Sequence, residues 1–244
     1  MKKRALALAI YLLLIHSLLA LVLTKSNFIE KVSARLGMVD STSTQPLGNH
    51  EYYMQALGRY FDKRTETLGK TPRVIFIGDS IVNMLCVESK FNAINFGISG
   101  DTVRLAKKRV TGYHNLSGKT IVLAIGINDV PRENIEIVTD YRQLLTNLPK
   151  DSKVIISSVL PIDEEVYFKF WKVRKLNSQI DDLNYQLSQL AKEFNNVRFA
   201  DTSTGLRKLG VGLDSNFHTG DGIHLNKTGY EVWGKMLSAA INER

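Results

Sequence analysis

The sequence predicts an α/β fold in which parallel strands alternate with helices, and helices cover both faces of one sheet. Short apolar, β-branched runs recur along the chain, and longer segments with helical spacing lie between most of them. Because parallel strands are joined by right-handed crossovers, these elements predict three layers, α/β/α. The length of 244 residues and the hydrophobic share of 44% suit one globular domain with a full-sized core.

The N-terminus is predicted to lie in a membrane. The run from Ala5 to Thr24 contains no charged residue and is long enough, as a helix, to cross a bilayer. No good Ala-x-Ala cleavage site follows it, so residues 1–25 are predicted to form an uncleaved signal anchor, a transmembrane helix; secretion after signal cleavage is the alternative. The cluster Lys2-Lys3-Arg4 predicts a single-pass protein whose main domain lies outside the cytoplasm, in the periplasm if the source is a bacterium.

Residues 26–70 are expected to connect this anchor to a domain of residues 71–244. The stretch from Met38 to His50 is rich in Ser, Thr, Gly and Pro, which is typical of a linker. Apolar residues then recur at helical spacing and predict a short helix that leads into the domain. These residues are Tyr53, Leu57, Tyr60 and Phe61.

Five apolar runs are predicted to be the strands of the sheet. They are Val74 to Ile77, Ala93 to Phe96, Ile121 to Ile125, Val154 to Val159 and Val197 to Ala200. The clearest helical pattern extends from about Lys172 to Phe194 and is expected to face the core, with a coiled-coil seam as the alternative. The aromatic segment from Glu165 to Trp171 is expected to be a loop that either walls a substrate cleft or docks this helix.

Charge and cysteine content argue against several functions. The formal net charge of +8 comes from Lys and Arg that are scattered along the chain, which indicates a solvated basic surface and no nucleic-acid partner. The single cysteine, Cys86, can form no internal disulfide and is expected to be buried. His114 and His218 have no ligand partners at metal spacing, and Gly112 to Thr120 is one residue too long for a phosphate-binding loop. No metal and no cofactor are therefore expected.

Polar residues that follow the predicted strands are the candidates for chemistry, because ligands gather at the carboxyl ends of parallel strands. Gly78-Asp79-Ser80 ends the first strand, Gly97 to Thr102 follows the second, and Gly126 to Asp129 follows the third. Asp221-Gly222-Ile223-His224 precedes the last helix, which Asn226 is expected to cap. Each segment alone is compatible with an ordinary turn or a helix cap.

Together these segments provide the groups that acyl transfer requires. A serine hydroxyl becomes a nucleophile when a neighbouring base accepts its proton, so Ser80 is predicted to attack and His224 to move the proton. Asp221, three residues before His224, is predicted to hold the histidine in place. Three donors are expected to form an oxyanion hole: the amide of Ser80, the amide of Gly100 and the side-chain amide of Asn128.

The order Gly-Asp-Ser, Gly, Gly-x-Asn-Asp and Asp-x-x-His resembles the SGNH hydrolase superfamily, also called GDSL esterases and lipases. Its four signature residues are matched here by Ser80, Gly100, Asn128 and His224. The resemblance extends over roughly Thr71 to Arg244, and the segment Asn95 to Thr102 looks most like the catalytic subunits of intracellular platelet-activating-factor acetylhydrolase and their bacterial relatives. It implies a flavodoxin-like fold with a parallel sheet, a Ser-His-Asp triad without metal, and hydrolysis of esters or thioesters.

Two departures limit what this resemblance implies. Ile81 stands where the common motif has leucine, which is a conservative apolar change. The intracellular acetylhydrolases lack the N-terminal apolar segment, so their phospholipid substrate is not carried over to this chain. Asp129 is expected to support its loop and not to join the triad.

The predicted function is removal of short acyl groups from a small molecule, a lipid or a glycan, through an acyl-Ser80 intermediate that water resolves. An acyl transferase to a cell-envelope glycan is one alternative, because the same intermediate serves both reactions. A non-catalytic module that binds glycans or lipids is the other. The predicted partners are the acylated substrate and, through residues 1–25, the membrane.

Overall fold

The computed structural model describes residues 58, 60–65, 69–113, 116–130, 132–171, 175–209 and 211–243. The predicted anchor of residues 1–25 and most of the predicted linker lie outside these residues. Within the described ranges, no helix is both long enough and apolar enough to span a bilayer. The short helix expected before the domain is described only at Gly58 and at residues 60–65, which are helical.

One parallel sheet forms the centre of the domain, with the strand order β2-β1-β3-β4-β5. The strands are β1 (Val74–Gly78), β2 (Ala93–Gly97), β3 (Thr120–Ala124), β4 (Lys153–Ser157) and β5 (Val197–Ala200). Each predicted apolar run is therefore a strand, and the predicted five-stranded parallel sheet is confirmed. Gly78 pairs with both Gly97 and Ala124, so the loops that follow β1, β2 and β3 leave the sheet side by side.

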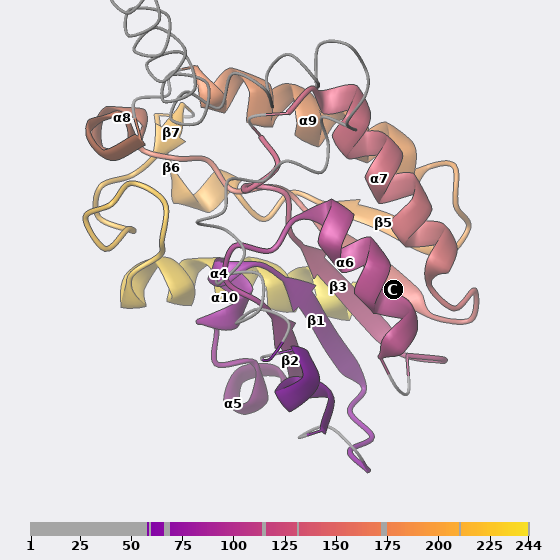
Figure 1. Cartoon of the computed structure of the whole chain (residues 1–244). Coiled ribbons are helices and arrows are strands. Elements are labelled where there is room, and N and C mark those ends of the chain that lie inside the picture. The colour runs from indigo at the N-terminus through magenta and orange to yellow at the C-terminus, as the bar shows by residue number, and fades with distance from the viewer. Residues whose placement is uncertain are drawn as a thin grey trace, which may run out of the picture. The chain divides into compact units, whose positions relative to one another are not determined.

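Helices cover both faces of this sheet (Figure 1). The chain moves from β1 outward to β2 and then back past β1 to β3, so right-handed connections place the intervening helices on opposite faces. Figure 1 shows α6 and α7 in front of the sheet and α10 behind it. The helices on the α6 face are α6 (Val103–Arg109), α7 (Asn134–Asn147) and α9 (Leu176–Ala191); those on the α10 face are α4 (Ser80–Asn83), α5 (Val87–Phe91) and α10 (Lys227–Asn242).

The core lies on both sides of the sheet. All residues of β1 and β2 are buried, which explains why these strands read as nearly continuous apolar runs. Helix α9 buries its apolar stripe, so the core-facing prediction is confirmed against the coiled-coil alternative. The buried stripe consists of Leu176, Ile180, Leu183, Leu187 and Leu190.

Two elements differ from the sequence prediction. The segment expected to be a loop is a helix, α8 (Glu164–Trp171), because Asp163 Oδ1 accepts the Val166 amide at 3.3 Å and two glutamates in the first turn favour a helix start. The long helix begins at Leu176, not near Lys172, because Lys175 has a left-handed backbone with φ +62°.

The prediction for the single cysteine is wrong: Cys86, expected to be buried, is exposed.

Two short 3-10 helices and a small hairpin connect the larger elements. They are η1 (Val110–Gly112), η2 (Thr204–Leu206), β6 (Arg207–Lys208) and β7 (Gly212–Leu213). The predicted cap of the last helix is confirmed, because the Asn226 side chain accepts the Gly229 amide at 2.9 Å. The chain between β7 and α10 carries the last pair of predicted site residues.

Candidate active site

Ser80 follows the carboxyl end of β1, as the first residue of α4. Asp79 caps this helix by accepting the Ile81 amide at 3.0 Å, which fixes the turn between strand and helix. Ser80 is 9% exposed, so the residue is largely buried and keeps a small accessible surface. The first amides of a helix are not used by the helix itself, and the Ser80 amide is one of them.

The three residues predicted to form a triad lie in one chain of hydrogen bonds. Ser80 Oγ is 3.0 Å from His224 Nε2, and His224 Nδ1 is 2.5 Å from Asp221 Oδ2. Asp221 Oδ1 also accepts the amides of Ile223 and His224, at 3.0 and 2.9 Å. The carboxylate therefore holds both the backbone and the ring of the histidine.

The protonation pattern of this chain follows from its donors and acceptors. Burial by itself would raise the pKa of Asp221, but the hydrogen bonds from the His224 ring and from the Ile223 and His224 amides outweigh it, and the pKa lies below its usual range. An ionised carboxylate only accepts, so the proton of the neutral ring resides on Nδ1. Nε2 is then free to accept the proton of the Ser80 hydroxyl.

The other two residues predicted for the oxyanion hole, Gly100 and Asn128, lie on the loops after β2 and β3. Gly100 has a left-handed backbone with φ +72°, a conformation that glycine adopts without strain. Asn128 is exposed, and its Nδ2 donates to the Asp101 carbonyl at 2.9 Å. This bond joins the loop after β2 to the loop after β3. A side-chain amide carries two N–H groups, so the bond to Asp101 leaves a second one for a substrate.

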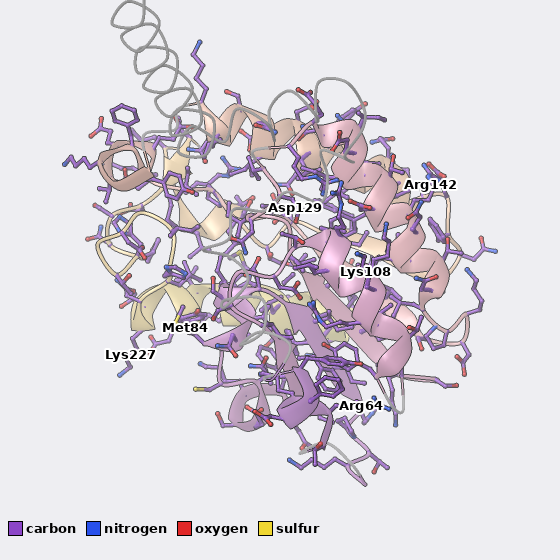
Figure 2. All side chains as sticks on the ribbon, in the orientation of Figure 1. Arg64, Met84, Lys108, Asp129, Arg142 and Lys227 are labelled. Atoms are coloured by element: carbon purple, nitrogen blue, oxygen red, sulfur yellow. The ribbon has the colours of Figure 1, made fainter. Side chains whose placement is uncertain are left out.

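Asp129 also connects the loop after β3 to the chain that follows β2. Its Oδ2 accepts the amide of Val103, the first residue of α6, at 2.9 Å, and its Oδ1 accepts Arg132 at 2.8 Å. The residue is 0% exposed, and burial raises its pKa to about 6. Figure 2 shows Asp129 in the interior beside the start of α6. These contacts agree with the predicted supporting role.

The sequence indicated only that His218 has no ligand partners at metal spacing, and the structure places it within the predicted triad loop. His218 is buried, and its Nδ1 accepts the amides of Gly220 and Gly222, which flank Asp221. Its Nε2 is 3.2 Å from Asp163 Oδ2. The spacing His218-x-x-Asp221 was visible in the sequence, but nothing there indicated that Asp163 is its partner. Nowhere in the described ranges do three or more His, Cys, Asp or Glu side chains group as metal ligands would.

Comparison with known proteins gives a consistent result. Residues 76–232 match the model of the GDSL-like lipase/acylhydrolase family. Platelet-activating factor acetylhydrolase IB subunit alpha2 of Bos taurus and of Homo sapiens is 29% identical to this chain, over 70% of this chain and 77% of the relative. The resemblance to the SGNH hydrolase superfamily is therefore confirmed.

Solved structures share the fold. A Streptococcus pneumonia protein named for platelet activating factor has a TM-score of 0.69 and 22% identity, over 81% of this chain and 100% of its own. An acetylxylan esterase of Geobacillus stearothermophilus has a TM-score of 0.55 and 20% identity, over 72% of this chain and 96% of its own. The family model covers more than half of the 244 residues. This chain belongs to the GDSL-like lipase/acylhydrolase family.

Proposed function

We propose that the protein is a serine esterase that hydrolyses carboxylic esters or thioesters through an acyl-Ser80 intermediate. The observation that carries this proposal is the continuous chain from Ser80 Oγ through the His224 ring to Asp221, with links of 3.0 and 2.5 Å. The link between Ser80 and His224 is short enough for direct proton transfer, and the link between His224 and Asp221 is short enough to orient the ring. Neither requires any movement of the backbone.

The geometry supports a two-step mechanism. Ser80 Oγ attacks the carbonyl carbon of the substrate while His224 Nε2 takes the hydroxyl proton. The C–O or C–S bond to the leaving group then breaks as Nε2 gives that proton to the leaving oxygen or sulfur. Water then attacks the acyl-Ser80 carbonyl, giving its proton to Nε2, and the free acid leaves as Ser80 Oγ regains the proton. In both steps the amides of Ser80 and Gly100 and the side chain of Asn128 stabilise the negative oxygen.

The proposed substrate is a short acyl ester of a lipid, a glycan or a small molecule. Two of the similar proteins are named as an acetylhydrolase and an acetylxylan esterase, so both names refer to acetyl esters. Catalytic mutants of the Geobacillus stearothermophilus esterase change one serine, one aspartate and one histidine, the residue types proposed here. Acetate is accordingly the acyl group to test first.

Hydrolysis of p-nitrophenyl acetate by Ser80→Ala tests the proposal. We expect kcat to fall on the order of 10⁶-fold, the loss that follows removal of a triad nucleophile. Ser89→Ala is the matched control, because Ser89 is exposed and, among the residues that the structure describes, its hydroxyl bonds only to the Cys86 carbonyl, at 3.3 Å. Undiminished turnover by Ser80→Ala would overturn the proposal, and acetylated product that forms only with a sugar acceptor would identify the transferase alternative.

We also propose that residues 1–25 anchor the enzyme in a membrane with residues 71–244 outside the cytoplasm. The uncharged run from Ala5 to Thr24 and the preceding basic cluster support this orientation. Protease added to intact spheroplasts should digest the enzyme domain. Protection of the domain in intact spheroplasts, with digestion after lysis, would contradict the proposed orientation.

A further inference from the structure

The loop that presents Asp221 and His224 has little regular structure of its own. It runs between β7 and α10. Among the described residues, its backbone is paired through the bridge of His218 with Leu225, through a few bonds near that bridge, and through single bonds to Leu206 and Asp163. Thr219 N donates to the His224 carbonyl at 2.9 Å, which closes the loop at its base. The position of the triad pair therefore depends on contacts that side chains make inside the loop.

The ring of His218 makes the central contacts. Nδ1 accepts the Gly220 amide at 3.0 Å and the Gly222 amide at 3.2 Å, and the side chain is 4% exposed. Because two N–H groups point at Nδ1, that atom carries no proton. The proton of the neutral ring is then on Nε2, where Asp163 Oδ2 lies 3.2 Å away and accepts it. One tautomer satisfies every polar atom of the ring.

The backbone around Asp221 is shaped to make these bonds. Gly220 and Gly222 have left-handed conformations, with φ +103° and +81°. A Cβ on Gly222 would lie 2.7 Å from the Asp163 carbonyl oxygen, so the loop sits directly on the segment before α8. Asp163 N donates to the Gly222 carbonyl at 2.8 Å. Asp163 thus holds the loop twice, through its amide and through its carboxylate.

We propose that His218, held by Asp163, is a positioning residue for the reaction of Ser80. The His218 ring fixes the two amides that flank Asp221, and Asp221 in turn orients the His224 ring toward Ser80. Neither His218 nor Asp163 belongs to the Ser80, Asp221 and His224 chain, so both act through it. The inference rests on the proposed esterase function, and displacement of a reacting group by about 1 Å is enough to slow catalysis on the order of 100-fold.

Two substitutions of His218 separate positioning from simple packing. His218→Leu fills space but offers no acceptor to the Gly220 and Gly222 amides. His218→Asn places an amide oxygen near the position of Nδ1, so it restores that acceptor and gives up the bond to Asp163. We expect kcat for p-nitrophenyl acetate to fall on the order of 100-fold in His218→Leu, with little change in KM. In His218→Asn most of kcat should return.

Three further measurements make the test decisive. The rate at which a fluorophosphonate labels Ser80 should fall in parallel with kcat, because labelling uses the same nucleophile. Ser152→Ala is the stability control: Ser152 is 1% exposed and donates to the Leu116 carbonyl at 2.6 Å at the opposite edge of the sheet, so this variant should lose stability and keep kcat. Asp163→Asn keeps an oxygen for the Val166 amide and turns an N–H toward Nε2. This favours the tautomer with its proton on Nδ1, which can no longer accept the Gly220 and Gly222 amides, so kcat should fall.

The outcomes are distinct. Wild-type kcat and labelling in folded His218→Leu would overturn the positioning role, and so would equal losses in His218→Leu and His218→Asn. If His218→Leu does not fold, a wild-type kcat in Asp163→Asn would overturn it. Ser80→Ala is assayed alongside: an active Ser80→Ala protein refutes the proposed function itself, whereas an inactive one with a fully active His218→Leu refutes only the positioning role.

Discussion

Ser80 Oγ and His224 Nε2 lie 3.0 Å apart, although 144 positions separate the two residues in sequence. Docking of α10 onto α4 maintains this proximity. Tyr230, in the first turns of α10, donates its hydroxyl to the Ile81 carbonyl at 2.8 Å, one residue after Ser80. The two ends of the site are thus joined by a hydrogen bond outside the reacting groups.

Asp221→Asn is expected to lower kcat on the order of 10⁴-fold with little change in KM. An asparagine can donate to Nδ1, which would move the ring proton to Nε2 and leave the Ser80 hydroxyl without a base. Steady-state hydrolysis of p-nitrophenyl acetate measures the effect. Asp214→Asn is the control. Asp214 Oδ1 accepts the Asn216 amide, as Asp221 Oδ1 accepts the Ile223 amide, and among the described residues Asp214 makes no hydrogen bond to a histidine ring. A loss of less than tenfold in Asp221→Asn would show that Asp221 only shapes its turn.

Asn128→Ala is expected to lower kcat by about 100- to 1000-fold, the usual loss when one oxyanion donor is removed. Asn128 is exposed, and within the described part of the chain its side chain makes one hydrogen bond, to the Asp101 carbonyl, so the melting temperature should change little. Asn128→Asp is the matched variant, since it keeps the shape and removes the donor. Normal turnover in both variants, or an unfolded Asn128→Ala protein, would show that the residue serves the structure and not the oxyanion.

Sequence patterns were sufficient for the strands and for the Ser80, Asp221 and His224 chain. The five strands are buried apolar runs with turn residues at their ends, and these are local signals. Parallel pairing then brings the carboxyl ends of β1, β2 and β3 to one edge, so residues far apart in sequence could be grouped. The chemistry of serine, histidine and aspartate limited what such a group could do.

Other features depend on contacts that a local pattern does not contain. The aromatic residues of α8 suggested a loop that walls a cleft or docks the next helix. The segment is instead a helix, whose start is stabilised by the Asp163 side chain accepting the Val166 amide. The same Asp163 is the partner of His218, which lies 55 positions away. Asn95, inside β2, donates to the carbonyls of Val82 and Leu85, at 2.8 and 3.0 Å, and so fixes the turn after α4. Pairings of this kind follow from the tertiary structure, and no spacing in the sequence indicates them.

Asp129→Ala is expected to lower the free energy of unfolding by about 1–3 kcal/mol, because the buried Val103 amide loses the acceptor that it has among the described residues. Arg132 keeps its bond to Asp140 at 2.7 Å, so it is not left unpaired. Urea denaturation gives the change in stability. Asp129→Asn retains an oxygen for the Val103 amide and should recover part of the loss. Equal stability of Asp129→Ala and the wild type would contradict the role assigned to this carboxylate.

Asp79→Asn is expected to change how stability depends on pH. Asp79 is 2% exposed, and burial, with a contribution from the charge of Asp129, raises its pKa from 3.8 to about 7. The folded chain therefore binds this proton more tightly than the unfolded chain does, so the free energy of unfolding falls as pH rises from 3.8 to about 7 and then levels off. Asparagine carries no such proton. The stability of Asp79→Asn minus that of the wild type should thus rise across that interval, by up to about 1.4 kcal/mol per pH unit, and stay constant above it.

Urea denaturation of both proteins at several pH values measures this difference. A difference that is constant from pH 4 to pH 8 would show that the folded and unfolded chains bind the Asp79 proton equally, and that its burial next to the nucleophile does not perturb its titration.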